Sequence, residues 1–173
     1  STQMAKIYCA AYGLNTCAAI LYNHESPRCS GQFVTMKVAR AAARIRRGQQ
    51  KKLQLGNLAG QRDWGWAPDF VRGFWMMLQQ EKVDDFVLAT GVLHSVEQLV
   101  ARAFAVVGLD WREFVEHDAG LMTAVEPARL CGNPAKAKQV LGWENTVPFE
   151  EMVEKLEVSQ NEVRKAEGRR QKA

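Results

Sequence analysis

Short apolar runs of strand length alternate along this chain with longer segments in which apolar residues recur at helical spacing. The runs at 16–22 and 85–91 are mostly apolar and are followed by polar residues or end in glycine, which is typical of short strands. Between them, 33–48 is rich in Ala and Arg and closes on Gly48, and 67–82 repeats large apolar residues. Both segments predict helices.

Capping residues predict two further helix starts. Ser95 before a run at 94–110, with Gln98 three residues later, matches a capping box. Asn133 followed by Pro134 predicts an N-cap and a first helical position. The apolar residues of the helix over 67–82, with Trp75, Met76 and Met77, are expected to lie in the hydrophobic core of the domain. Strands alternating with helices in this way predict an α/β or α+β fold.

Composition places the chain among ordinary globular domains. Its 173 residues are 47% hydrophobic and 24% charged, enough for one domain with a core of its own. The net charge of +4 is concentrated at 39–52 and in the tail at 164–173. A basic helix face of this kind either contacts RNA, DNA or a phosphorylated ligand, or is a solvated surface, which is the commoner case.

The four cysteines favour a reducing compartment. They show no C-x-x-C spacing and have no histidine at zinc-finger distance, and no signal peptide or transmembrane run is present. Disulfide frameworks belong to small secreted chains. We therefore expect four free thiols, no metal site, and a location in the cytoplasm or another reducing compartment.

Three polar clusters follow predicted strands or turns: Asn23 with His24, Arg62 with Asp63 in a glycine-rich loop, and the segment 89–91. Ligands of open α/β sheets lie beyond the carboxyl ends of the strands. Arg62 is therefore expected either to bind a phosphate in bidentate fashion or to form a salt bridge with Asp63 or Asp69.

Two more residues bear on this crevice. Lys37, one turn into its helix, is a second candidate cation for the same anion. His24 is either a structural hydrogen-bonding residue or a catalyst. No G-x-G-x-x-G turn follows a strand, so no segment of this chain is built to bind a dinucleotide pyrophosphate.

The motifs themselves are more specific. In order along the chain stand ILYNHESPR, FVTMKVARAAARI, LQLGNLAGQRDWGWAPDFV, FWMMLQQEKVDDFVLATGVLHSV and AKAKQVLGW. Together they resemble the GDP-mannose 4,6-dehydratases, which belong to the extended short-chain dehydrogenase/reductase family. The resemblance runs from about Met4 to about Glu157.

The resemblance implies an α/β fold of a particular kind. It is a partial NAD(P)-binding Rossmann-type fold that lacks the N-terminal dinucleotide-binding half, together with the smaller substrate-binding α/β domain. Residues 1–157 then correspond to the C-terminal half of the dehydratase, and 158–173 to a basic helical or disordered tail. The family reaction converts GDP-mannose to GDP-4-keto-6-deoxymannose and water, with NADP as the cofactor that takes and returns the hydride.

Residues carried over from the family define an expected site. Lys6 matches the catalytic lysine of the Tyr-x-x-x-Lys motif, which also holds the cofactor ribose, and His24 matches a cofactor-binding histidine. The positions that match the GDP-sugar site are Asn23, Val34, Lys37, Gly56, Arg62 and Glu126. Three positions depart from the family: Thr2 replaces the tyrosine, Cys29 a cofactor-binding arginine, and Thr123 a phosphate-binding arginine.

Two functions follow from this mixture. The first hypothesis is that the chain is the GDP-mannose-binding half of such a lyase, inactive in isolation and completed by a partner polypeptide or a homo-oligomer. Alternatively, it is a degenerate, non-catalytic homologue that serves as a structural subunit of a larger assembly, such as a ribonucleoprotein. In either case we expect the strands at 16–22 and 85–91 to pair with a partner chain or to rearrange, because unpaired sheet edges are a liability.

Overall fold

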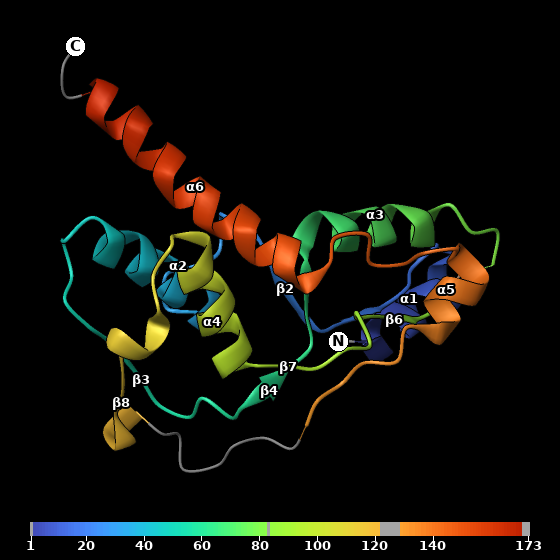
Figure 1. Ribbon diagram of the computed structural model, residues 1–173. Helices are drawn as coiled ribbons and strands as arrows, with labels where there is room; N and C mark the ends of the chain where they lie inside the picture. The colour runs from blue at the N-terminus through green and yellow to red at the C-terminus, as the bar shows by residue number, and fades with distance from the viewer. Residues whose placement is uncertain (1, 83, 122–128, 171–173) are drawn as a thin grey trace. The chain divides into compact units, whose positions relative to one another are not determined.

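A computed structural model describes residues 2–82, 84–121 and 129–170. The chain divides into two compact units that alternate along the sequence (Figure 1). Unit 1 comprises residues 1–24, 63–93 and 131–147, and unit 2 comprises 25–62, 94–130 and 148–173. Each unit is therefore assembled from three separate stretches of the chain.

Unit 1 is built on a parallel pair of strands. β1 (Ala19–Leu21) pairs with β6 (Phe86–Leu88) in register Ala19 to Phe86. The helices of this unit are α1 (Thr2–Tyr12), α3 (Ala67–Leu78) and α5 (Ala135–Leu141). Both α3 and α5 contact β6, and β2 (Asn23–Glu25) pairs with β5 (Trp64–Trp66).

The two predicted strands thus pair with each other. Their sheet has only these two strands within the described residues, and pairing with a partner chain stays a prediction.

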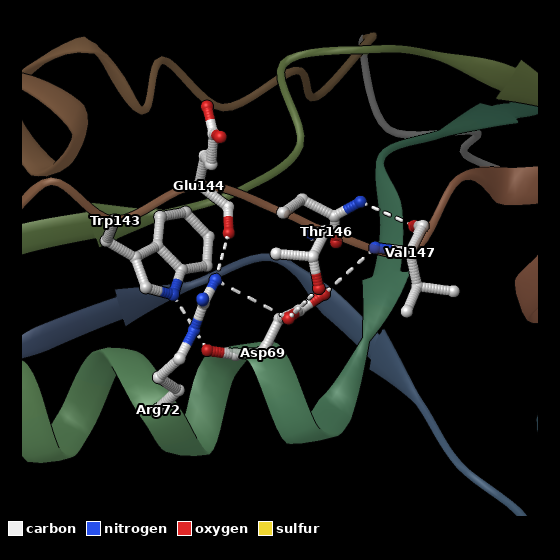
Figure 2. Close-up of polar contacts among 7 residues, drawn as sticks. Asp69, Arg72, Trp143, Glu144, Thr146 and Val147 are labelled. Carbon is white, nitrogen blue, oxygen red and sulfur yellow. Dashed lines mark hydrogen bonds and ion pairs between the residues drawn. The ribbon is translucent and has the colours of Figure 1, made fainter.

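The segment after α5 is tied to the first turns of α3. The indole Nε1 of buried Trp143 donates to the backbone carbonyl of Asp69 at 2.7 Å. The Asp69 carboxylate accepts hydrogen bonds from the Thr146 hydroxyl at 2.6 Å and from the backbone N–H groups of Thr146 and Val147 (Figure 2). A buried carboxylate needs such donors. These hydrogen bonds to Asp69 therefore hold the backbone of residues 143–147 against the start of α3.

Gly73 allows this packing. A Cβ atom at Gly73 would lie 2.7 Å from a methyl group of Leu88 and 3.0 Å from the Trp143 indole nitrogen. Such distances are far inside van der Waals contact, so α3 approaches β6 and Trp143 this closely only with glycine at position 73.

The expectation that Trp75 lies in the core was wrong. Its side chain is 64% exposed, whereas Phe70, Gly73 and Met77 are buried. Residues three and four apart share a helix face. Trp75 is two positions from both Gly73 and Met77, so it points away from the face that those residues define.

Unit 2 is a three-helix layer with short strand pairs beside it. α2 (Val34–Arg46), α4 (Val96–Val106) and α6 (Phe149–Arg170) contact one another (Figure 1). β3 (Leu53–Leu55) pairs with β8 (Val115–His117) in parallel, and β4 (Gln61–Arg62) with β7 (His94–Ser95) antiparallel. Two 3-10 turns complete it, η1 (Trp111–Glu113) and η2 (Ala119–Leu121).

The predicted helix signals have two outcomes. The capping box is confirmed: the Ser95 hydroxyl accepts from the Gln98 N–H, and the Gln98 side chain accepts from the Ser95 N–H. At the other start, the helix begins at Ala135 with Pro134 as N-cap, one residue later than predicted. The Asn133 side chain still accepts from the Ala135 N–H at 3.0 Å, because an Asx turn satisfies that donor from either position.

Two further observations bear on the chemistry. All four cysteines are free thiols, as expected. No helix within the described residues is both long enough and apolar enough to cross a membrane.

Candidate functional site

Asp63 joins two of the predicted polar clusters within unit 1. Its buried carboxylate accepts from the Thr90 N–H at 2.9 Å, the Thr90 hydroxyl at 2.6 Å, and the Gly91 N–H at 3.0 Å. The Gly132 N–H also donates to it, at 3.2 Å. The carboxylate therefore fixes the loop after β6 and the segment before α5, and it is fully occupied by these donors.

The cofactor positions carried over from the family lie in unit 1. His24, in β2, is exposed; its Nδ1 lies 2.9 Å from the Tyr22 carbonyl, and its ring stacks on Phe70 with centroids 5.0 Å apart. Neighbouring Asn23 is exposed. Lys6, in α1, is 70% exposed, and its Nζ is 3.3 Å from Asp85 Oδ2.

Three of the predicted GDP-sugar residues gather around the start of α2 in unit 2. Val34 is the first helical residue, and Lys37 follows one turn later. The Lys37 ammonium donates to the Gln54 carbonyl in β3 at 2.9 Å, and Gly56 directly follows that strand. A helix N-terminus with a lysine in its first turn favours an anion.

Arg62 lies in β4 of the same unit. It is half-buried, pairs in register with His94 of β7, and forms a bridge with Leu130. Its guanidinium donates to the Gln61 carbonyl at 2.7 Å. The carboxylates of Asp63 and Asp69 accept hydrogen bonds from other donors. This favours phosphate binding by Arg62 over a salt bridge to either carboxylate.

The departures from the family are only partly described. Cys29 is half-buried, and its sulfur accepts from the Ser26 N–H at 3.4 Å. Burial raises the pKa of the Cys29 thiol, with the nearby Glu25 carboxylate adding to the effect. A thiol is never a cation, so this residue does not replace the charge of the family arginine. Thr123 and Glu126 lie outside the described residues, and Thr2 is described only as the first residue of α1.

Sequence reasoning missed one group of chemical interest. Glu157, on α6, is completely buried, and neither of its carboxylate oxygens has a hydrogen-bond partner in the described structure. Burial raises its pKa to about 8, against a lowering by the charge of Arg47. The signal available in the sequence was its place beside Val153 and Leu156 in a helical repeat, where a glutamate is unexpected.

The sequence matches known dehydratases over most of its length. The profile of the family described as GDP-mannose 4,6 dehydratase matches residues 1–156. GDP-mannose 4,6 dehydratase 2 of Arabidopsis thaliana is 49% identical over 149 residues, which cover 86% of this chain and 40% of the relative. The Vibrio cholerae GDP-mannose 4,6-dehydratase is 39% identical over 185 residues, with 88% and 50% coverage. The chain thus spans half or less of these curated relatives.

Solved structures agree on the fold. The RMD protein of Pseudomonas aeruginosa, solved with NADPH, superposes with a TM-score of 0.86 at 18% identity, over 94% of this chain and 54% of the other. The dTDP-glucose 4,6-dehydratase of Bacillus anthracis, solved with NAD, gives 0.78 at 18% identity, over 94% and 50%. This chain covers about half of each of these larger proteins, so its α/β structure is a partial Rossmann-type fold.

Proposed function

Because the chain belongs to the GDP-mannose 4,6-dehydratase family, we propose that it is the GDP-sugar-binding part of such an enzyme. The bound ligand is then GDP-mannose, with Asn23, Val34, Lys37, Gly56 and Arg62 as its binding residues. Glu126 belongs to the same proposed set. The reaction of the complete enzyme is the NADP-dependent elimination of water from GDP-mannose, the first chemical step toward a 6-deoxy sugar nucleotide such as GDP-fucose.

One observation carries this proposal: the cations of the expected nucleotide site are kept within one unit. Lys37 stands one turn into α2 with its ammonium on the Gln54 carbonyl of β3, and Arg62 is half-buried in β4. A diphosphate needs such cations because charge-assisted bonds to phosphate are about twice as strong as neutral ones.

The NADP requirement is met only in part. Lys6 and His24 are candidate contacts for the nicotinamide end of the cofactor, and they form part of unit 1. The sequence has no glycine-rich turn to bind the pyrophosphate, and Thr2 stands where the family has its tyrosine base. The residues present therefore do not fit a complete cofactor site, and we derive no catalytic step through NADP.

A partner chain or a further copy is proposed to complete the sheet. Ile20 of β1 is 50% exposed, and Leu21 is also exposed, in a parallel two-stranded sheet. Parallel sheets are normally covered on both faces. These exposed apolar side chains support the proposal that a partner polypeptide or a second copy of the chain packs against the sheet.

GDP-mannose or GDP is expected to raise the melting temperature of the chain. A ligand that binds only the folded state adds RT ln(1 + [L]/Kd), about 2.7 kcal/mol at a hundredfold excess over Kd. Arg62→Ala should abolish the shift because it removes a phosphate-binding cation. The measurement is thermal melting by circular dichroism with each ligand.

Arg112→Ala is the matched control, since Arg112 is an exposed arginine of the same unit that contacts only its neighbours Asp110 and Trp111 among the described residues. It should leave the ligand-induced shift intact. The absence of any shift with either ligand in the unsubstituted chain would contradict the binding proposal.

The second candidate function is a structural subunit without catalysis. Thr2 at the position of the catalytic tyrosine and Cys29 at that of a cofactor arginine favour it. Both candidates predict that the isolated chain, supplied with NADP and GDP-mannose, yields no 4-keto-6-deoxy product, because Thr2 stands where the family has the tyrosine that acts as general base. Product detected by mass spectrometry would refute this, and a ligand-induced melting shift without turnover would favour the first candidate.

A further inference from the structure

The amino end of the strand pair in unit 1 carries two neighbouring acids. Asp84 and Asp85 come directly before β6. One carboxylate oxygen of Asp85 accepts a hydrogen bond from the Ala18 N–H at 2.8 Å, and Ala18 comes directly before β1. Asp85 therefore marks the amino ends of both parallel strands at once.

Two lysines reach these acids from different helices. Lys6 of α1 lies with its Nζ 3.3 Å from the other carboxylate oxygen of Asp85. Lys136 of α5 has its Nζ 2.6 Å from a carboxylate oxygen of Asp84, and it donates to the Asp85 carbonyl at 2.8 Å. We call these four residues the amino-edge cluster. Its two positive and two negative charges pair with one another, as in a structural ion network.

The other residue matched to the cofactor site stands at the opposite end of the strands. His24 lies beyond the carboxyl end of β1, and ligands of open parallel sheets bind beyond the carboxyl ends. A strand rises about 3.3 Å per residue, so the four positions from Asp85 to Ala89 span about 13 Å. That length far exceeds the hydrogen-bond reach of about 3 Å. Lys6 and His24 therefore cannot contact the same end of a cofactor in this arrangement.

The position of Lys6 within α1 agrees with this. α1 ends at Tyr12, and residues 13–18 lead from there to the amino end of β1. Lys6 is six residues before the end of the helix, which is about 9 Å of helix at 1.5 Å per residue. None of the described side chains of α1 is buried. Core packing therefore does not hold this helix in place, and the ion pair with Asp85 links it to the amino edge.

We infer that Lys6 is a structural residue of the amino-edge cluster and takes no part in holding the nicotinamide ribose. Of the two candidate cofactor contacts in unit 1, His24 keeps its place at the carboxyl end, and Lys6 does not share it. A chain that completes the enzyme, as proposed above, then has to supply the ribose-binding cation as well as the tyrosine base. The inference concerns positions within unit 1, so it does not depend on GDP-mannose binding.

Zero-length crosslinking of the full chain with a water-soluble carbodiimide tests this placement. The reagent activates a carboxylate, and a lysine amine in ion-pair contact with it forms an amide, with the net loss of one water. Peptide mapping by mass spectrometry should find Lys6 joined to Asp85 and Lys136 joined to Asp84. Asp85→Asn should abolish the first link and keep the second, and Asp84→Asn should do the reverse. Asparagine keeps the oxygen that accepts a backbone N–H at either position, and unaltered melting temperatures would show that both variants are folded.

Acetylation with an amine-reactive ester gives a second measure, and Lys6 should react at the same rate with and without NADPH. Strong protection of Lys6 by NADPH would overturn the inference. So would the absence of a link between Lys6 and Asp85 in a sample where Lys136 and Asp84 are joined. A link from Lys6 to Asp63, whose carboxylate is bound by the loop after β6, would place Lys6 at the carboxyl end and overturn it as well.

Discussion

Replacing Glu157 with leucine is expected to stabilise the protein at pH 8 and to remove much of its pH dependence above pH 5. Glu157 is fully buried on α6, and neither carboxylate oxygen has a hydrogen-bond partner in the described structure. An isolated buried carboxylate is costly when ionised. Leucine keeps similar volume and removes that cost.

The direction of the pH effect follows from the pKa of Glu157, which burial raises from 4.5 to about 8. Between these values the unfolded chain releases the proton while the folded chain keeps it. The stabilising contribution is therefore complete below pH 4.5, falls as the pH rises toward 8, and is constant above it. The loss across this window is at most about 5 kcal/mol, from 1.36 kcal/mol for each pH unit.

Urea denaturation of the unsubstituted chain, of Glu157→Leu and of Glu157→Gln at pH 5 and pH 8 measures both the stabilisation by leucine and the pH-dependent contribution of the carboxyl group. The difference in free energy of unfolding between the two pH values should shrink in the Gln variant, because the titrating group is gone. Glu151→Gln is the control, as Glu151 is an exposed acid of the same helix paired with Lys155. An equal pH dependence in the unsubstituted chain and Glu157→Gln would refute the assignment.

Asp63→Ala is expected to destabilise the protein by about 3–5 kcal/mol, through the loss of charge-assisted bonds and the donors left unpaired. Four hydrogen bonds converge on this carboxylate, which is 1% exposed. Its removal leaves the N–H groups of Thr90, Gly91 and Gly132 without their acceptor. Chemical denaturation gives the free energy, and amide hydrogen exchange at these three residues localises the change.

Two companion variants interpret that result. Asp63→Asn keeps one acceptor oxygen, so its loss should be smaller than that of Asp63→Ala. Glu144→Ala removes an exposed carboxylate of the same unit, paired at the surface with Lys138, and should change stability by no more than about 1 kcal/mol. Comparable losses for Asp63→Ala and Glu144→Ala would show that the network around Asp63 contributes little.

Local signals predicted β1, β6 and the helices α2, α3 and α4, and they placed the start of α5 within one residue. The capping box at Ser95 and the glycine stop at Gly48 depend on neighbours within one turn, and both appear in the structure: Gly48 adopts φ 69°, the left-handed conformation that ends a helix. The family motifs were likewise readable, since they are contiguous stretches of sequence. The choice of Lys37 and Arg62 as site cations came from those motifs, and both lie in unit 2 as half-buried side chains.

The errors and omissions concern residues whose surroundings come from elsewhere in the chain. Trp75 has the same helical spacing from its neighbours as a core residue would have, but β6, α5 and Trp143 occupy the opposite face of α3. The helical repeat that Glu157 shares with Val153 and Leu156 was the only local signal of its burial, and it depends on α2 and α4 packing against α6. Asp63 looked like a partner for Arg62 because they are adjacent, yet its acceptors are taken by residues 27 to 69 positions away.

The sequence by itself determined the family of this chain, the type of its main elements and their caps, because these depend on periodicity and on neighbours within a few residues. Only the tertiary structure decided how six stretches of chain form two units, which acids are buried, and at which end of the strand pair Lys6 lies. Burial is set by contacts between segments far apart in sequence, and desolvation then fixes the charge state of Glu157 and the hydrogen bonds of Asp63.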